Sequence, residues 1–269
     1  MITIPADLAK IIDEAWEATS TVPGYLLENE ARFLGFLAAC IPAKGRIVEI
    51  GSFKGRSTVM LAKVAAHYGL GQVVAIDPHN FNLSEKTEVA SEALARPAST
   101  KVDFLNSLLV AGVMEQVGFH HALSKEVSSS WNEPIRLLWI DGDHTYRGAK
   151  DDFDGFAPHV KPGGVIALHD ALNAFSGPIR VFVEEMLRSN QFGAAGFVHS
   201  MAWAQFRPGD GEKFREKRER LARRASRLIP FVKDDAELRG LRKKLYKLHR
   251  SRVPRKIPGV ADWATIFDG

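Results

Sequence analysis

The chain has 269 residues, of which 45% are apolar and 25% charged, so it can bury a core and is not expected to be disordered. It contains one cysteine, Cys40, which excludes an internal disulfide and, within an apolar stretch, is expected to be a small core residue. No apolar run approaches the roughly 18 residues of a membrane-spanning helix, and the first residues show no secretion signal. We therefore expect a cytoplasmic protein.

The net charge of +4 conceals two parts of opposite sign. Residues 212–256 carry 18 Lys and Arg against 6 Asp and Glu, a balance of +12, so the rest of the chain carries −8. We therefore expect an acidic body with a basic tail, and the two parts need separate explanations.

The spacing of apolar residues predicts an alternation of helices and strands along the body. The predicted helices cover residues 5–20, 27–40, 56–67, 84–94, 107–117, 146–156 and 179–189. The predicted strands cover residues 46–50, 72–76, 119–123, 135–140, 164–168 and 197–206. This alternation predicts an α/β fold with a doubly wound, mostly parallel sheet covered by helices on both faces. We divide the chain into an N-terminal helical cap (1–42), a sheet domain (43–207) and a basic amphipathic helical tail (208–269).

Two apolar strands end in acidic and imidazole groups. One run ends at Ile140 and is followed by D-G-D-H at 141–144, and a second ends at Leu168 and is followed by H-D at 169–170. Polar residues at the carboxyl ends of neighbouring parallel strands lie in the crevice at the edge of the sheet, where ligands bind. These side chains are therefore expected to form one compact site, which suits a divalent cation or proton transfer.

Residues 47–58, I-V-E-I-G-S-F-K-G-R-S-T, indicate a strand, a glycine-containing turn and the start of a helix. Glycine lets a ligand approach the backbone, and the helix N-terminus offers unpaired N–H groups. A P-loop needs four residues between its glycines, but three separate Gly51 from Gly55, and the dinucleotide motif G-x-G-x-x-G is absent. What remains is Glu49 before these glycines and Asp77 at the end of the next strand, where a carboxylate can bind ribose hydroxyls.

This combination resembles the class I S-adenosylmethionine-dependent methyltransferases, whose first motif is E-x-G-x-x-x-G and whose second strand ends in an acid. Over about residues 46–170 the chain resembles their small-molecule and sugar O-methyltransferase branch, which includes macrolide-sugar and catechol-type enzymes. The middle glycine of the commonest motif is replaced by Phe53. The resemblance implies a set of cofactor-binding residues: Glu49, Gly51, Ser52 and Gly55 at the methionine end, Asp77 at the ribose, Ser124 near the adenine, and Asp141.

The acidic strand ends resemble the metal site of the same branch, in which an Asp ends the fourth strand and two oxygen ligands end the fifth. This resemblance implies metal ligands at Asp141, His169 and Asp170. His169 departs from the pattern, because Mg²⁺ prefers oxygen ligands whereas imidazole suits Zn²⁺, Fe²⁺ or Mn²⁺. Either a divalent cation such as Mn²⁺ replaces Mg²⁺, or His169 transfers protons and no metal is bound.

In catechol-type enzymes the catalytic base lies three residues after the metal-binding Asp, a position that His144 occupies here. A neutral His can take a proton from a hydroxyl at physiological pH. The resemblance therefore implies His144 and Asp141 as the catalytic residues.

Each of these residues also has a purely structural interpretation. Asp141 and Asp143 could cap the following helix, and His144 could be a turn residue. His169 and Asp170 could form an internal hydrogen-bonded pair. Tyr25 either lines the cofactor pocket or only packs. Three further acids are assigned to a solvated helix face: Asp151, Asp152 and Asp154.

The basic tail contains two apolar stripes at helical spacing: Phe214, Leu221, Ala225, Leu228 and Ile229 in the first, and Leu238, Leu241, Leu245 and Leu248 in the second. Cationic amphipathic helices fit an anionic membrane surface, a nucleic acid or a protein partner. They equally fit a hairpin folded back on the acidic body or on a second subunit. Nucleic acid is the weakest of these partners because the tail lacks a pattern of stacking aromatic residues. The expected partners are a small-molecule or glycan acceptor, a second copy of the chain, and an anionic membrane to which the protein is peripheral.

The sequence thus predicts an enzyme that methylates a hydroxyl of a small molecule or glycan with S-adenosylmethionine, with or without a divalent cation, Mg²⁺ or Mn²⁺. Two other classes remain open. A non-haem metal oxygenase or hydroxylase could use His144, Asp141 and His169, although the glycine turn would then have no purpose. A catalytically silent protein that binds membrane surfaces through its tail would consume no cofactor.

Overall fold

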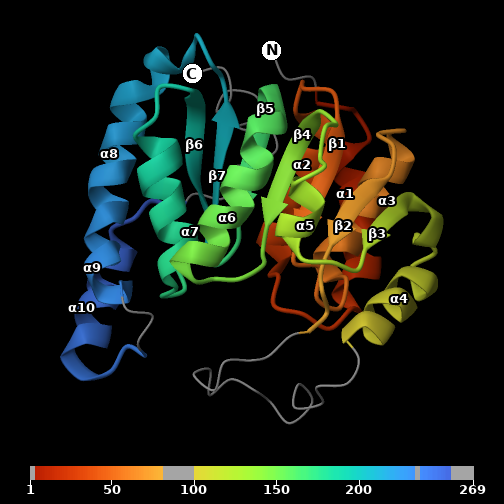
Figure 1. The fold of residues 1–269 in the computed structure, drawn as a ribbon, viewed down its shortest axis with the longest axis horizontal. Coiled ribbons are helices and arrows are strands. Elements are labelled where there is room, and N and C mark those ends of the chain that lie inside the picture. The colour runs from red at the N-terminus through yellow and green to blue at the C-terminus, as the bar shows by residue number, and fades with distance from the viewer. Residues whose placement is uncertain (1–3, 81–99, 234–236, 256–269) are drawn as a thin grey trace.

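The computed structural model describes residues 4–80, 100–233 and 237–255. They form a seven-stranded sheet in the order β3-β2-β1-β4-β5-β7-β6, with helices on both faces (Figure 1). The predicted doubly wound α/β fold is confirmed. No helix in these residues is long and apolar enough to cross a membrane.

The first five strands are parallel, and β7 runs antiparallel to both of its neighbours. The strands are β1 (Arg46–Ile50), β2 (Val73–Ile76), β3 (Val117–His120), β4 (Ile135–Ile140), β5 (Val160–Leu168), β6 (Phe192–Val198) and β7 (Met201–Phe206). In the register of β4 with β5, Ile140 pairs with Leu168. The residues that follow these two strands are therefore brought together at one edge of the sheet.

Helices cover the two faces of the sheet in two layers (Figure 1). The helices are α1 (Leu8–Ser20), α2 (Glu28–Cys40), α3 (Arg56–His67), α4 (Thr100–Val110), α5 (Ser124–Ser128), α6 (Tyr146–Phe156), α7 (Ser176–Val181), α8 (Arg215–Ala225), α9 (Ile229–Val232) and α10 (Gly240–Ser251). A π-helical segment, η4 (Phe182–Leu187), continues α7. One apolar cluster joins α1–α4 to the sheet, and a second joins α6–α10 to its other face.

The central strands are apolar on both sides because each contributes to both clusters. In β1, Ile47 belongs to the first cluster and Val48 to the second, and Leu137 and Leu138 of β4 divide in the same way. This two-residue alternation explains why the strands read as unbroken apolar runs. Cys40, at the end of α2, is buried in the first cluster, as expected of a core residue.

Two predicted elements were wrong. The helix expected at 107–117 is α4, which begins at Thr100 and ends at Val110, because Gly112 has a φ of +66° and the chain turns there before β3. The single strand expected at 197–206 is the β6–β7 hairpin, which turns at His199 with a φ of +52°. The helix expected at 84–94 lies outside the described residues.

The basic tail folds back on the body beyond β6 (Figure 1). The first predicted stripe enters the core, with Phe214, Leu221, Ala225 and Leu228 buried. Of the second stripe, Leu238 is buried, but the leucines of α10 are exposed. Two stripes that look alike in the sequence therefore have opposite surroundings.

Candidate active site

The turn after β1 adopts the conformation that its glycines predict. Gly51 and Gly55 have φ angles of +83° and +91°. A Cβ on Gly51 would lie 2.3 Å from the carbonyl oxygen of Asp141, so no larger residue fits there. Phe53, which replaces the usual middle glycine, also has a positive φ of +47°. Phe53 therefore adopts a left-handed conformation that favours glycine, and the turn lies directly against the end of β4.

Glu49 is fully buried behind this turn. The hydroxyls of Ser57 and Thr58, at the start of α3, both donate hydrogen bonds to its carboxyl group. Burial raises the pKa of Glu49 to about 8, because these hydrogen bonds offset only part of the cost of desolvation. Glu49 therefore joins β1 to α3 as a largely neutral carboxyl, and its contact with a cofactor stays a prediction.

Asp77 follows β2 and stabilises the same turn. Its carboxylate accepts hydrogen bonds from the backbone N–H of Phe53 (2.7 Å) and of His79 (2.6 Å). Beside it, Ser52 is only 2% exposed, and its hydroxyl has no hydrogen-bond partner in the described part of the chain. A buried polar atom without a partner calls for an explanation, and a polar ligand held at the turn supplies one.

Ser124 begins α5, and its hydroxyl donates a 2.5 Å hydrogen bond to Asp152 on α6. The assignment of Asp152 to a solvated helix face was wrong, because this residue is buried, whereas Asp151 and Asp154 are exposed. Burial raises the pKa of Asp152 to about 6. The signal in the sequence was its position three residues after Ala149, on the apolar face of the helix.

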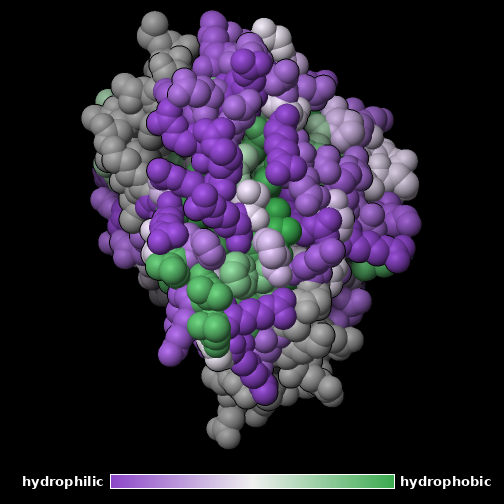
Figure 2. All heavy atoms as spheres, turned by 90° about the vertical axis from the view of Figure 1, so that its left-hand side faces the viewer, coloured by the Kyte–Doolittle hydropathy of each residue, from purple (hydrophilic) through white to green (hydrophobic). Residues whose placement is uncertain are grey.

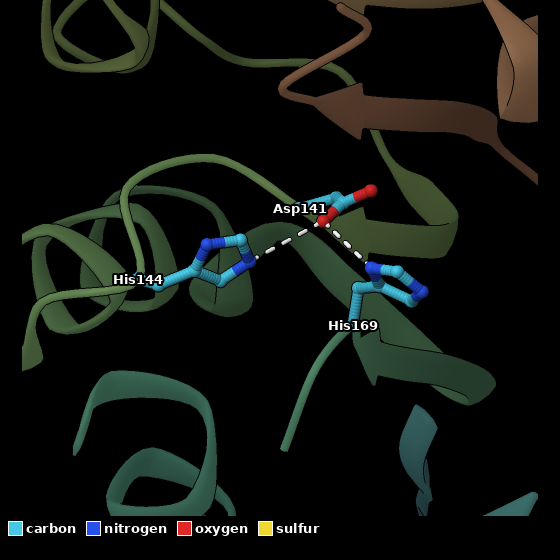
Figure 3. A group of neighbouring side chains, drawn as sticks. All are labelled: Asp141, His144 and His169. Atoms are coloured by element: carbon cyan, nitrogen blue, oxygen red, sulfur yellow. Dashed lines mark hydrogen bonds and ion pairs between the residues drawn. The ribbon is translucent and has the colours of Figure 1, made fainter. Parts of the chain in front are cut away.

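Asp141, His144 and His169 converge at the ends of β4 and β5 (Figure 3). Oδ1 of Asp141 lies 3.4 Å from Nε2 of His144 and 3.0 Å from Nδ1 of His169. Asp170 borders the group, with Oδ2 at 3.8 Å from Nε2 of His144. The compact arrangement expected from the two strand ends is thus present, whereas the roles of the individual side chains stay predictions.

The group is held together by opposite charges. Burial opposes the ionisation of Asp141, but the charge of His169, its hydrogen bond and the nearby ring of His144 outweigh burial and lower the pKa of Asp141 to about 2. Burial alone would lower the pKa of His169, but the charges of Asp141 and Asp170 raise it well above its ordinary value. The pKa of His144 is also raised, because its contacts with Asp141 and Asp170 outweigh desolvation. The carboxylates around His169 therefore favour its protonated form.

Glu30, on α2, is the residue that sequence reasoning missed. Its side chain is 1% exposed, and Oε2 lies 3.4 Å from Nε2 of His169. Oε1 accepts hydrogen bonds from the N–H (2.9 Å) and the hydroxyl (2.6 Å) of Ser200. Burial would raise the pKa of Glu30, but His169 and Ser200 outweigh it and lower the pKa to about 2. Both ring nitrogens of His169 thus face carboxylates.

The structural interpretations are borne out only in part. Thr145 caps α6 by accepting the N–H of Gly148 (3.1 Å), and Asp143 accepts the N–H of Thr145 (2.8 Å), so Asp143 belongs to the cap. His144 instead faces Asp141 and Asp170, and its ring stacks on that of Phe175 with the ring centroids 4.6 Å apart. Tyr25 packs on Phe53, with ring centroids 6.2 Å apart, and its contact with a cofactor stays a prediction.

Comparison with known proteins agrees with this fold. Residues 48–171 match a family model described as a methyltransferase domain. An O-methyltransferase from Bacillus cereus in complex with SAH has 20% sequence identity and a TM-score of 0.50, and the match covers 75% of this chain and 92% of that one. The O-methyltransferase NovP has 12% identity and a TM-score of 0.55, over 74% of this chain and 98% of that one. At these identities the likeness is one of fold.

Proposed function

We propose that this chain, a class I methyltransferase by its domain and its fold, transfers the methyl group of S-adenosylmethionine to a hydroxyl oxygen of a small molecule or glycan. The observation that carries the proposal is the contact between Gly51 and Asp141, which places the glycine turn directly against the acid–imidazole group. The oxygenase alternative is set aside, because the methyltransferase match spans all three of its candidate ligands.

The turn would hold the cofactor, which supplies an electrophilic methyl group when bound. The backbone from Gly51 to Gly55 offers a close approach, and the hydroxyl of Ser52 has a hydrogen bond to give. Asp77 is already oriented by two backbone N–H groups, so its remaining lone pairs can accept from ribose hydroxyls. Asp152 fixes the hydroxyl of Ser124, the residue expected near the adenine.

His144 is the proposed general base. Asp141 and Asp170 both approach its Nε2, so they stabilise the imidazolium that forms when the ring takes the proton of the acceptor hydroxyl. Stacking on Phe175 fixes the plane of the ring. Most of the acceleration would come from this positioning of the base and acceptor and from stabilising the developing alkoxide.

A divalent cation at Asp141, His169 and Asp170 is the second part of the proposal. Oδ1 of Asp141 and Oδ1 of Asp170 lie 3.0 Å and 3.5 Å from Nδ1 of His169, and this mixed set of imidazole and carboxylate donors fits Mn²⁺ better than Mg²⁺. His144, whose ring also lies within the 4.8 Å group of Asp141 and His169, is kept as the base. When bound, such an ion would lower the pKa of the acceptor hydroxyl. Because both nitrogens of His169 face carboxylates, the ring would first have to release a proton.

We keep three further expectations as proposals: the division of the chain at 42/43 and 207/208, a homo-oligomer, and contact of the basic tail with an anionic membrane. The burial of Leu221 and Ala225 supports the alternative that the first stripe of the tail braces the body. The charge of +12 over residues 212–256 supports an anionic partner for the surface that remains.

Binding of S-adenosylhomocysteine tests the proposal most directly. At one hundred times the dissociation constant, the ligand should add about 2.7 kcal/mol to the free energy of unfolding, measured as a rise in melting temperature. Asp77→Ala should lose most of this rise, whereas Asp154→Ala, at an exposed acid, should keep it. A panel of hydroxylated acceptors, assayed by release of S-adenosylhomocysteine, then distinguishes an enzyme from a silent binding protein. Absence of any thermal shift with the wild type would refute the proposal.

A further inference from the structure

The outward face of α10 is apolar. Leu241, Leu245 and Leu248 are 71%, 39% and 47% exposed. They are spaced four and three residues apart, so they lie on one side of the helix. Figure 2 views the side of the molecule formed by α8–α10 and shows a hydrophobic area low on a largely hydrophilic face. Leucines that gather on one face in this way differ from scattered surface residues, which need no explanation.

The opposite face of α10 is fastened to the body. Tyr246 is buried, and its hydroxyl accepts the backbone N–H of Ala174 at 3.0 Å. Arg250 donates a 3.0 Å hydrogen bond to the side chain of Asn173. The helix therefore cannot rotate to bury its leucines without breaking these contacts, and the apolar stripe is a fixed part of the surface.

Cationic side chains border the leucines. Lys244 lies three residues after Leu241 and four before Leu248, so it is adjacent to both on the helix surface. Lys244 and Lys247 are exposed, and neither forms an ion pair with another residue that the structure describes. Further exposed arginines lie on or just after α8: Arg223, Arg224 and Arg227.

We propose that this face of α10 binds the surface of a membrane that contains anionic lipid. The leucines would enter the boundary between headgroups and acyl chains while the lysines contact phosphates, as in other interfacial helices. A second copy of the chain fits less well, because a two-fold axis through this face would bring the lysines at 244 and 247 of one copy close to those of the other. A nucleic acid would satisfy the lysines but leave the leucines in water.

The membrane surface would lie beside the catalytic crevice. Asn173 and Ala174, which hold α10, belong to the segment between Asp170 and Phe175. Asn173 donates a 2.6 Å hydrogen bond to Asp170, and Phe175 stacks on His144. Docking through α10 therefore fixes how the crevice is oriented to the lipid, a consequence that rests on the proposed function.

The test is co-sedimentation of the full chain with vesicles of phosphatidylcholine alone or with 30% phosphatidylserine, at low and high salt. The wild type should bind the anionic vesicles only, and salt should weaken the binding. Lys244→Gln and Lys247→Gln should each weaken it about fivefold. Leu241→Ser/Leu245→Ser/Leu248→Ser should abolish it. The matched control is Leu109→Ser/Val110→Ser, at exposed apolar residues of α4, which should bind as the wild type does.

Failure of the wild type to bind anionic vesicles would overturn the proposal, as would equal loss in the α4 control. If the triple leucine variant instead lowers the molar mass measured by light scattering, the face joins two copies of the chain and the membrane proposal is wrong. Each variant is also titrated with S-adenosylhomocysteine. An unchanged thermal shift shows that the variant is folded and separates a failure at the membrane from a failure of the proposed methyl transfer.

Discussion

Nε2 of His169 lies 3.4 Å from Oε2 of Glu30, although 139 residues separate them in the chain. Nδ1 of the same ring lies 3.0 Å from Oδ1 of Asp141, so the imidazole ring bridges helix α2 and the end of β4. Glu30 and His169 are 1% and 3% exposed, so solvent does not screen their charges. The first helices of the chain thereby take part in the electrostatics of the site.

Glu30→Gln removes one of the three carboxylates that lie close to the ring of His169. Leaving a buried charge with an incomplete set of partners typically costs about 3–5 kcal/mol, so we expect a loss of that order in the free energy of unfolding. Urea denaturation at neutral pH measures it. Glu28→Gln, on the same helix at an exposed ion pair with Arg32, is the matched control and should cost less than about 1 kcal/mol. Equal losses in the two variants would contradict this role of Glu30.

Glu49 should make stability depend on pH in the direction opposite to that of an ordinary paired acid. Its pKa is about 8 in the folded protein, above the ordinary value of 4.5, so the folded state holds the proton more tightly. The free energy of unfolding should therefore fall as pH rises from about 4.5 to about 8, by up to about 1.4 kcal/mol per pH unit.

The measurement compares urea denaturation of the wild type and Glu49→Gln at pH 5, 6.5 and 8. The variant has no group to titrate at this position, so the difference between the two proteins should shift in favour of the variant as pH rises. Glu115→Gln, at an exposed acid, should follow the wild type at every pH. A constant difference between the wild type and Glu49→Gln would show that Glu49 is ionised in the fold.

His144→Asn should lower turnover at least ~100-fold and leave the affinity for S-adenosylhomocysteine nearly unchanged, as expected for loss of a general base. The base acts only when neutral, and its pKa is raised above 6.5, so wild-type turnover should rise with pH through a value above 6.5. Turnover measured at pH values from 5.5 to 9 tests this rise. His159→Asn, just before β5 at the opposite edge of the sheet, should retain both rate and profile. Full activity of His144→Asn would discard the assignment.

Mn²⁺ should stabilise the protein at pH 8.5 and much less at pH 6. The reason is that a metal competes with the proton of His169, whose pKa is raised well above its ordinary value. Thermal shifts with Mn²⁺ and Mg²⁺ at the two pH values measure the effect, and Asp141→Asn should remove it. If neither ion shifts the melting temperature at either pH, the site works without a cation and His144 alone remains as the base.

The sheet was predictable because parallel strands that are buried on both sides leave unbroken apolar runs such as the one that ends at Ile140. The pairing of the groups after β4 and β5 also followed from the sequence, since neighbouring parallel strands end at the same edge. The end of α4 was missed because a helical apolar stripe continues past Gly112, and the φ of that glycine is decided by the route of the chain to β3.

Glu30 could not be identified from the sequence. Glu28 and Glu30 are both acids in the first turn of α2, and either suits the N-terminus of a helix. Only the packing of α2 over the β6–β7 hairpin makes one an exposed partner of Arg32 and the other a buried partner of Ser200 and His169. The burial of the two apolar stripes in the tail could not be predicted either. Helical spacing shows that a helix has an apolar face, but not whether the body covers that face.

The contact of Gly51 with the backbone of Asp141 has a consequence for how the enzyme could diversify. Two main-chain segments meet here, the turn after β1 and the end of β4, and there is no room for a side chain at Gly51 between them. The separation between the turn and the end of β4 is therefore set by the pairing of β1 with β4 in the sheet. We therefore expect new methyl acceptors to be accommodated by changes in other segments around the site. Those segments can vary in length and composition while the contact between the turn and the end of β4 is preserved.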